Sequence, residues 1–139
     1  MAGLDRFLAA QANEYETALR ELKSGAKRSH WMWYVFPQVA GLGHSAMARH
    51  FAIRDLEETK AYLAHDVLGP RLVESCEAML GWAGKRTAPE ILGQIDAMKF
   101  RSSMTLFERA DPDRFEFGQA IDAFYDGKRD ERTLAFLTG

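Results

Sequence analysis

The residues most able to do chemistry lie in two short stretches that place cations beside aromatic or hydroxyl groups. The first stretch, residues 27–38, opens with a basic run and is the densest aromatic region of the chain. Its candidate ligand contacts are Lys27, Arg28, His30, Trp31, Trp33 and Gln38. Cations beside a helix start favour an anion, because free backbone amides and the helix dipole add to their charge. The indole faces can stack on a base or a sugar.

The second stretch, residues 99–103, places two cations ahead of consecutive serines. Its candidate contacts are Lys99, Arg101, Ser102 and Ser103. Cations and hydroxyls together are suited to binding a phosphate or a carboxylate. If the two stretches lie side by side in the fold, they form one shared pocket for a small anionic ligand. This pocket is our main functional hypothesis from the sequence.

Each of these features also has a purely structural explanation. The tryptophans can belong to the core, with the cations forming a solvated rim around them. Serine often caps a helix, so Ser102 or Ser103 can mark a helix start. His30 titrates in the range that proton transfer needs, but a general base requires an oriented partner. The sequence therefore leaves any catalytic residue unknown, and whether the protein is an enzyme stays open.

The remaining motifs favour neither a cofactor nor a metal site. Residues 41–43, Gly-Leu-Gly, lack the third glycine or the Lys-Ser/Thr pair of a phosphate-binding loop. No two of the four histidines have the spacing that places both metal ligands on one helix face. Cys76, the only cysteine, lies on an apolar helical stripe and is predicted to be buried and inert. Adjacent carboxylates at Glu57 and Glu58 point in different directions on a helix and do not form an acid–base pair.

Length and charge restrict the class of protein. A chain of 139 residues fits one domain, spanning 1–139, that needs no metal or disulfide to hold its core. The formal net charge of -2 makes nucleic acid an unlikely partner, because proteins that bind phosphates along a strand usually carry a basic excess. No apolar run reaches the roughly 20 residues of a membrane span, and Asp5 interrupts any secretory signal. We expect a cytoplasmic protein, as a monomer or a homo-oligomer.

Apolar residues at helical spacing predict a mainly α domain of six to eight short helices. A first amphipathic helix is expected from Leu4 to Leu22, with Gly25 as a left-handed stop. A second is expected to begin near Ser29 as its cap and to end before Pro37, because proline disfavours helical geometry in the residue before it. Later helical segments are expected near residues 46–51, 56–63, 66–80, 88–92, 99–110 and 117–125, with a last turn or two at 131–137.

Capping signals support several of these helix starts. Ser45 is a predicted cap, and Asp130 is predicted to cap the last helix. Thr87 with Glu90 forms a capping box, in which each side chain bonds the backbone amide of the other residue. Asp55, with an acid three residues later, is an acidic version of the same box.

Three blocks of the sequence resemble a known family. The segments KRSHWMWYVFPQVAGLGHSAMARHFAI, YLAHDVLGPRL and KFRSSMTLF are similar to the hallmark blocks of the bacterial family named domain of unknown function 1810. The resemblance extends from Leu4 to about Leu137. It implies a compact, mainly helical domain and no established activity. The label calpastatin, sometimes applied to such proteins, has no physical support here, because calpastatin-type inhibition relies on disordered repeats.

Three functional hypotheses follow for the two stretches. The first is binding of a phosphorylated or nucleotide-like small molecule. A distant resemblance to proteins that process NAD and ADP-ribose compounds suggests the kind of ligand and nothing more. No catalytic motif of those proteins matches this sequence. The second is a non-catalytic interaction module that exposes the aromatic segment from Trp31 to Phe36. The third, single-stranded nucleic acid, is the least favoured because of the net negative charge.

Overall fold

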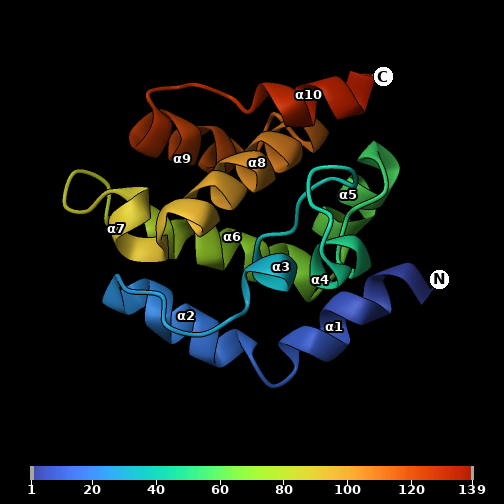
Figure 1. Cartoon of the computed structure of the whole chain (residues 1–139), viewed down its shortest axis with the longest axis horizontal. Coiled ribbons are helices and arrows are strands. Elements are labelled where there is room, and N and C mark those ends of the chain that lie inside the picture. Colours follow the sequence, from blue (N-terminus) through green and yellow to red (C-terminus); the bar gives the residue numbers. More distant parts are fainter. Residues whose placement is uncertain (1, 139) are drawn as a thin grey trace.

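The computed structural model describes residues 2–138 and has only helices as regular elements (Figure 1). A single turn, η1 (Ala2–Leu4), precedes ten α-helices, which confirms the mainly α prediction but exceeds the six to eight expected. The helices are α1 (Asp5–Gln11), α2 (Tyr15–Ser24), α3 (Met32–Val35), α4 (Ala46–His50), α5 (Leu56–Ala64), α6 (Leu68–Leu80), α7 (Ala88–Leu92), α8 (Gln94–Ala110), α9 (Phe115–Tyr125) and α10 (Glu131–Thr138). None of them, within the described residues, is long and apolar enough to cross a membrane.

The expected first helix is in fact two helices, α1 and α2. The chain turns at residues 12–14 because the end of α1 is held by a buried side chain rather than continued. The Gln11 side-chain amide donates to the backbone oxygen of Tyr34 at 2.6 Å and to the hydroxyl of Tyr62 at 3.1 Å. These contacts to α3 and α5 outweigh the local periodicity that predicted a continuous helix. Gly25 ends α2 with a φ of +75°, as predicted.

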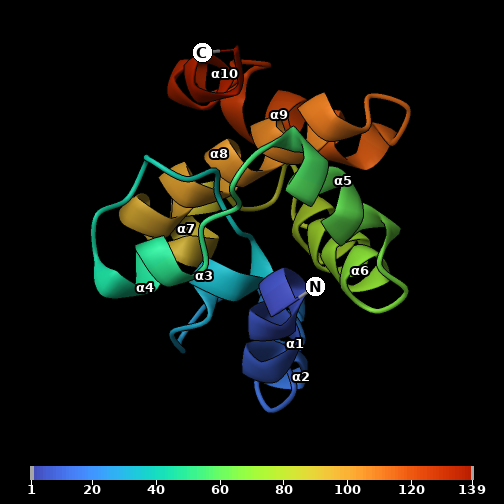
Figure 2. The same cartoon turned by 90° about the vertical axis from the view of Figure 1, so that its right-hand side faces the viewer.

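Helix α8 lies at the centre of the domain. It packs against α5, α7, α9 and α10, while α6 packs against α2, α5 and α9. Figure 2 shows α1 and α2 on one side of these helices and α10 on the opposite side. The two sequence stretches of interest therefore come from the loop before α3, which follows α2, and from the central helix itself.

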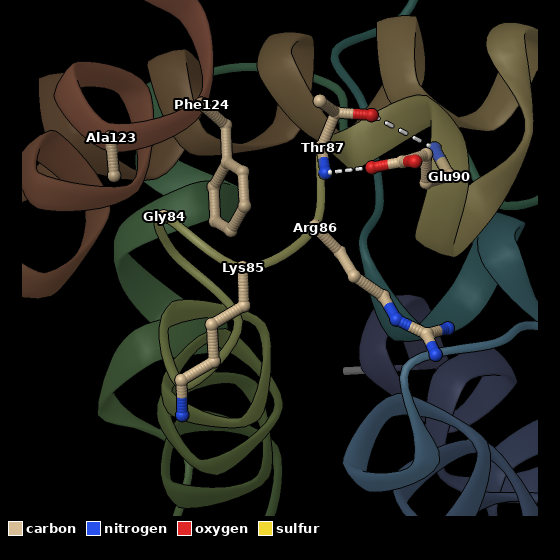
Figure 3. Close-up of a pocket in the computed structure, with 7 residues that line it drawn as sticks. All are labelled: Gly84, Lys85, Arg86, Thr87, Glu90, Ala123 and Phe124. Atoms are coloured by element: carbon tan, nitrogen blue, oxygen red, sulfur yellow. Dashed lines mark hydrogen bonds between the residues drawn. The ribbon is translucent and has the colours of Figure 1, made fainter.

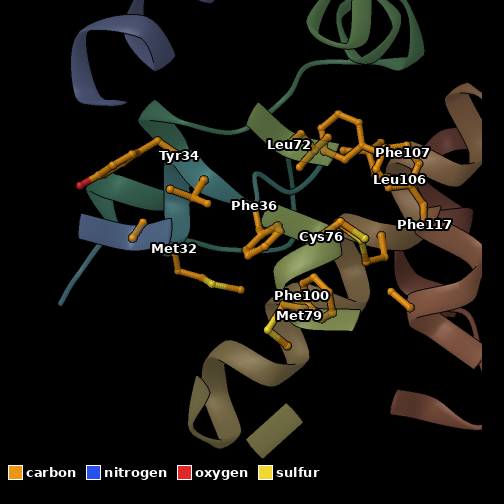
Figure 4. Close-up of a cluster of buried hydrophobic side chains, with 14 of the residues drawn as sticks. Met32, Tyr34, Phe36, Leu72, Cys76, Met79, Phe100, Leu106, Phe107 and Phe117 are labelled. Carbon is orange, nitrogen blue, oxygen red and sulfur yellow. The ribbon is translucent and has the colours of Figure 1, made fainter. Parts of the chain in front are cut away.

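The aromatic segment forms part of the core. Trp31, Met32 and Phe36 are each no more than 1% exposed. The ring of Phe36 meets that of Phe100 edge to face, with centroids 4.8 Å apart. Figure 4 shows the side chains of Met32 and Phe36 facing residues of α6 and α8, among them Cys76, which is buried as predicted. Helix α3 ends before Pro37, as predicted, but it starts at Met32, and Ser29 does not cap it.

The predicted caps are mostly confirmed. Ser45 accepts a hydrogen bond from the amide three residues later, and Thr87 and Glu90 bond each other's amides in a complete capping box. Asp130 precedes α10 and accepts from the amide of Thr133 at 3.2 Å. These short polar signals were read correctly because their partners lie within one turn of the chain.

The acidic capping box before α5 is only half present. Asp55 accepts from the amide of Glu58 at 2.9 Å, as predicted. The Glu58 carboxylate, however, accepts from the amide of Arg54 and pairs with Arg6 at 3.2 Å rather than bonding back to Asp55. A long-range ion pair thus replaces the local contact and ties α1 to the start of α5.

Candidate functional site

The two stretches meet at one carboxylate, that of Asp96 near the start of α8. The Lys27 ammonium lies 2.8 Å from one Asp96 oxygen, and the Lys99 ammonium lies 3.6 Å from the other. Asp96 was not among the residues singled out in the sequence, since a lone acid in an amphipathic helix carries no motif. The two stretches therefore lie side by side, as the pocket hypothesis required. The carboxylate between them, that of Asp96, partly neutralises both cations.

Each of these lysines also lies over an indole. The Lys27 ammonium is 5.1 Å from the ring centroid of Trp31, and the Lys99 ammonium is 5.1 Å from that of Trp33. Cations bind the faces of aromatic rings through the ring quadrupole. Because the Lys27 side chain is only 9% exposed, its charge is held by Asp96 and Trp31 rather than offered to a ligand.

A second carboxylate, Glu21 of α2, organises the loop that leads to α3. It accepts hydrogen bonds from the amides of Arg28 and Ser29, at 2.8 and 2.9 Å, from the Ser29 hydroxyl at 2.6 Å, and from the Trp31 indole at 2.9 Å. Burial alone would raise the pKa of Glu21, but these four donors outweigh it and lower that pKa to about 2. Glu21 therefore stays ionised and fixes the loop at physiological pH.

Trp31 and Ser103 are not available to a ligand. Trp31 is fully buried and its indole N–H is already bonded to Glu21. Ser103 is also fully buried, and its hydroxyl has no partner within residues 2–138. The interpretation that Ser102 or Ser103 caps a helix was wrong, because α8 begins eight residues before Ser102, at Gln94, and both serines lie in its interior.

Arg101 and Ser102 hold the chain that joins α9 to α10. The Arg101 guanidinium donates to the backbone oxygens of Lys128 and Arg129, at 2.7 and 3.0 Å. The Ser102 hydroxyl lies 2.9 Å from the Asp130 carboxylate. These contacts fix residues 128–130 against the middle of α8 and so place the start of α10 beside it.

A groove of about 360 Å³ lies between the loop of residues 38–48, one face of α8 and the start of α10. Its walls include four of the candidate ligand contacts, Gln38, Lys99, Arg101 and Ser102. The other lining residues are Leu42, Gly43, His44, Ser45, Ala48, Ile95, Met98, Asp130 and Arg132. The remaining six candidates, Lys27, Arg28, His30, Trp31, Trp33 and Ser103, do not line it. Arg28 and His30 are exposed elsewhere on the surface.

The groove carries a net positive charge. Lys99, Arg101 and Arg132 contribute three positive charges against the single carboxylate of Asp130, which leaves +2 with His44 neutral. The exposed Arg132 makes no hydrogen bond or ion pair within the described residues. No local sequence pattern pointed to Arg132, because it reaches the groove only through the packing of α10 on α8.

A second hollow, of about 300 Å³, lies between the Gly84–Glu90 loop and α9 (Figure 3). Apart from the exposed Lys85, its polar side chains already have partners among the described residues. Thr87 and Glu90 bond each other in the capping box, and the Arg86 guanidinium donates to the oxygen of Gly25 at 2.9 Å. This hollow therefore offers a ligand fewer free donors than the groove along α8.

Neither thiol nor metal chemistry has a clear place in the described part of the chain. Burial raises the pKa of the Cys76 thiol, so the nucleophilic thiolate is disfavoured. Among residues 2–138, no cluster of three or more His, Cys, Asp or Glu side chains is arranged to hold a metal ion.

Comparison with known proteins supports the family resemblance. The family model described as "Protein of unknown function (DUF1810)" matches residues 1–137. The chain belongs to the DUF1810 family. The fold is similar to the crystal structure of the conserved hypothetical protein Rv1873 from Mycobacterium tuberculosis, with a TM-score of 0.94 and 46% identity over 98% of this chain and 96% of that one. A search of the curated proteins finds no match.

Proposed function

We propose that the groove along α8 of this DUF1810 protein binds a small phosphorylated or nucleotide-like molecule. The observation that carries the proposal is the concentration of three cations against one carboxylate in a single hollow. That carboxylate, Asp130, accepts from the hydroxyls of Ser102 and Thr133 through Oδ2, so these contacts occupy one of its two oxygens. Charge-assisted hydrogen bonds from arginine to phosphate are among the stronger polar contacts in proteins.

Arg132 is the cation most able to bind such a ligand. The donors of Arg101 are largely committed to backbone oxygens, and Lys99 is paired with Asp96. Arg132 has an exposed guanidinium with all its donors free of partners among the described residues. Its planar fork can bind two oxygens of one phosphate.

The interaction module is less well supported than the small-molecule groove. Trp31 and Phe36 are 0% and 1% exposed, so the aromatic segment does not provide the surface patch that such a module needs. Trp33 is only partly buried, but one side chain does not make a patch.

Calorimetric titration and thermal unfolding with inorganic phosphate, ribose 5-phosphate and adenosine monophosphate test the proposal. At one hundred times the dissociation constant, a ligand stabilises the protein by about 2.7 kcal/mol. We expect stabilisation by at least one of these compounds, and a roughly fivefold loss of affinity in Arg132→Ala, since an exposed ion pair contributes up to about 1 kcal/mol.

Arg109→Ala is the matched control, because Arg109 is exposed on α8 and does not line the groove. Arg109→Ala removes the same charge as Arg132→Ala. If both variants lose the same affinity for these compounds, the effect of Arg132→Ala comes from net charge alone. No stabilisation by any of the three compounds at millimolar concentration contradicts the proposal.

A further inference from the structure

The groove along α8 has two chemically different ends. Ile95, Met98 and Ser102 lie on one helix face, at spacings of three and four residues. With a rise of 1.5 Å per residue, Ile95 and Ser102 are separated by about 10 Å along the helix axis. Along this helix face the lining therefore changes from apolar at Ile95 and Met98 to polar at Ser102, and the neighbouring Lys99 is paired with Asp96.

The polar end is fixed by the contact between α8 and α10. Ser102 lies 2.9 Å from Asp130, which places residue 130 and the nearby Arg132 at this end. Arg101 adds a second guanidinium one residue away from Ser102. Both arginines thus gather at the end of the groove that is farthest from Ile95.

The apolar end exposes side chains that usually avoid water. Ile95 is 72% exposed and Met98 is 69% exposed, the highest values among the exposed large apolar residues of the described chain. Leu42 lines the groove from the opposite loop. Covering these side chains stabilises a complex by roughly 25 cal/mol per Å² of apolar area, and a methionine thioether also makes favourable contacts with aromatic rings.

We infer that the ligand is a phosphomonoester that carries a flat aromatic ring, bound with its phosphate at the Arg101–Arg132 end and its ring at the Ile95–Met98 end. The inference rests on the proposed function and adds the class of ligand. A nucleoside monophosphate has this outline, since a sugar separates its base from its phosphate. A sugar phosphate or inorganic phosphate fills only the polar end.

Titration calorimetry with three probes separates the two ends: adenosine monophosphate, ribose 5-phosphate and hexyl phosphate. We expect Met98→Ser to weaken adenosine monophosphate about fivefold and to leave ribose 5-phosphate unchanged, because only the former reaches the apolar end. Arg132→Ala should weaken both by the same factor, because both place a phosphate at the polar end. Hexyl phosphate, which has an aliphatic chain in place of a ring, should bind more weakly than adenosine monophosphate.

Phe115→Ser is the control for a loss of exposed apolar surface, because Phe115 is 65% exposed on α9 and does not line the groove. It should leave all three affinities unchanged. Equal binding of adenosine monophosphate and ribose 5-phosphate, with no effect of Met98→Ser, overturns the two-ended ligand while the proposed anion groove stands. If hexyl phosphate binds as tightly as adenosine monophosphate, the inferred aromatic ring of the ligand is overturned, and the two-ended binding mode stands. Failure of all three probes to bind overturns the proposed function itself.

Discussion

Two regions of the domain contain similar residue types and use them in opposite ways. In the junction, defined here as Glu21, Asp96 and residues 27–31, the carboxylates and most of their donors are paired with one another. In the groove along α8, Arg132 is exposed and has no partner among residues 2–138, and Met98 is largely exposed. Both regions contain cations and lie beside apolar side chains.

The difference lies in what remains free after folding. Lys27 and Trp31 looked like ligand contacts because their types suit an anion and a base. The fold uses them to attach the loop before α3 to α2 and α8. Anion binding depends on donors without internal partners, so the groove is the better candidate although it has fewer aromatic residues.

Glu21→Ala is expected to have the largest effect, because it removes the acceptor for four donors at the junction. The indole N–H of Trp31 would be left buried without a partner, and each such group costs about 1–3 kcal/mol. We expect a loss of about 3 kcal/mol in the free energy of unfolding, measured by urea denaturation. Glu16→Ala, at an exposed position of the same helix, should change it by less than about 0.5 kcal/mol.

The difference in the free energy of unfolding between wild type and Glu21→Ala should depend on pH, which provides a second test. The pKa of Glu21 is lowered from 4.5 to about 2 in the folded protein, so the ionised form contributes stability above pH 4.5. That contribution falls as the pH decreases from 4.5 towards 2. The gap between wild type and Glu21→Ala should therefore narrow across this window, and a gap that is constant from pH 7 to pH 2 contradicts the role of the carboxylate.

Asp96→Ala is expected to have an intermediate effect. It leaves the nearly buried ammonium of Lys27 over Trp31 without its carboxylate and removes an acid from the first turn of α8. Because Asp96 itself is 18% exposed, water can replace part of the contact. We expect a loss of about 2 kcal/mol in the free energy of unfolding, which is below the full cost of breaking a buried pair.

Asp113→Ala, at an exposed position in the turn between α8 and α9, controls for the loss of an acid and should be nearly neutral. In Asp96→Ala, Lys99 also loses its partner and becomes freer to bind an anion in the groove. If Asp96→Ala changes the free energy of unfolding as little as the control does, Lys27 and Lys99 are solvated rather than held by Asp96. That result contradicts the contrast between the junction and the groove.

The sequence predicted features whose partners are close in the chain. The helical class, the stop at Gly25 and the caps at Ser45, Thr87 and Asp130 each depend on contacts within one turn, and each is confirmed. The break between α1 and α2 was missed because its cause, the buried Gln11, bonds residues 23 and 51 positions away.

The candidate site was only partly predictable for the same reason. Gln38, Lys99, Arg101 and Ser102 line the groove, but nothing in the local pattern separates them from Lys27, which lies outside it. Which candidates line the groove depends on partners such as Asp96, which lies far from Lys27 along the chain. Those partners are known only once the helices pack.

Removing Arg132 or Met98, two exposed side chains of the groove, is expected to have the smallest effect on stability, because neither makes a side-chain contact that holds the described helices together. Arg132→Ala and Met98→Ser should each change the free energy of unfolding by less than about 0.5 kcal/mol, measured by urea denaturation without ligand.

Arg101→Ala tests whether every arginine of the groove can be removed without a change in the free energy of unfolding, or only the one whose guanidinium is free. Although Arg101 lines the same groove, its guanidinium bonds the oxygens of Lys128 and Arg129, so its loss should cost about 1–2 kcal/mol. If Arg132→Ala destabilises the protein as much as Arg101→Ala, Arg132 has a structural partner, and its guanidinium is not free to bind a phosphate. If only Arg101→Ala is destabilising, the groove combines one arginine that fixes its shape with another that is free for the ligand.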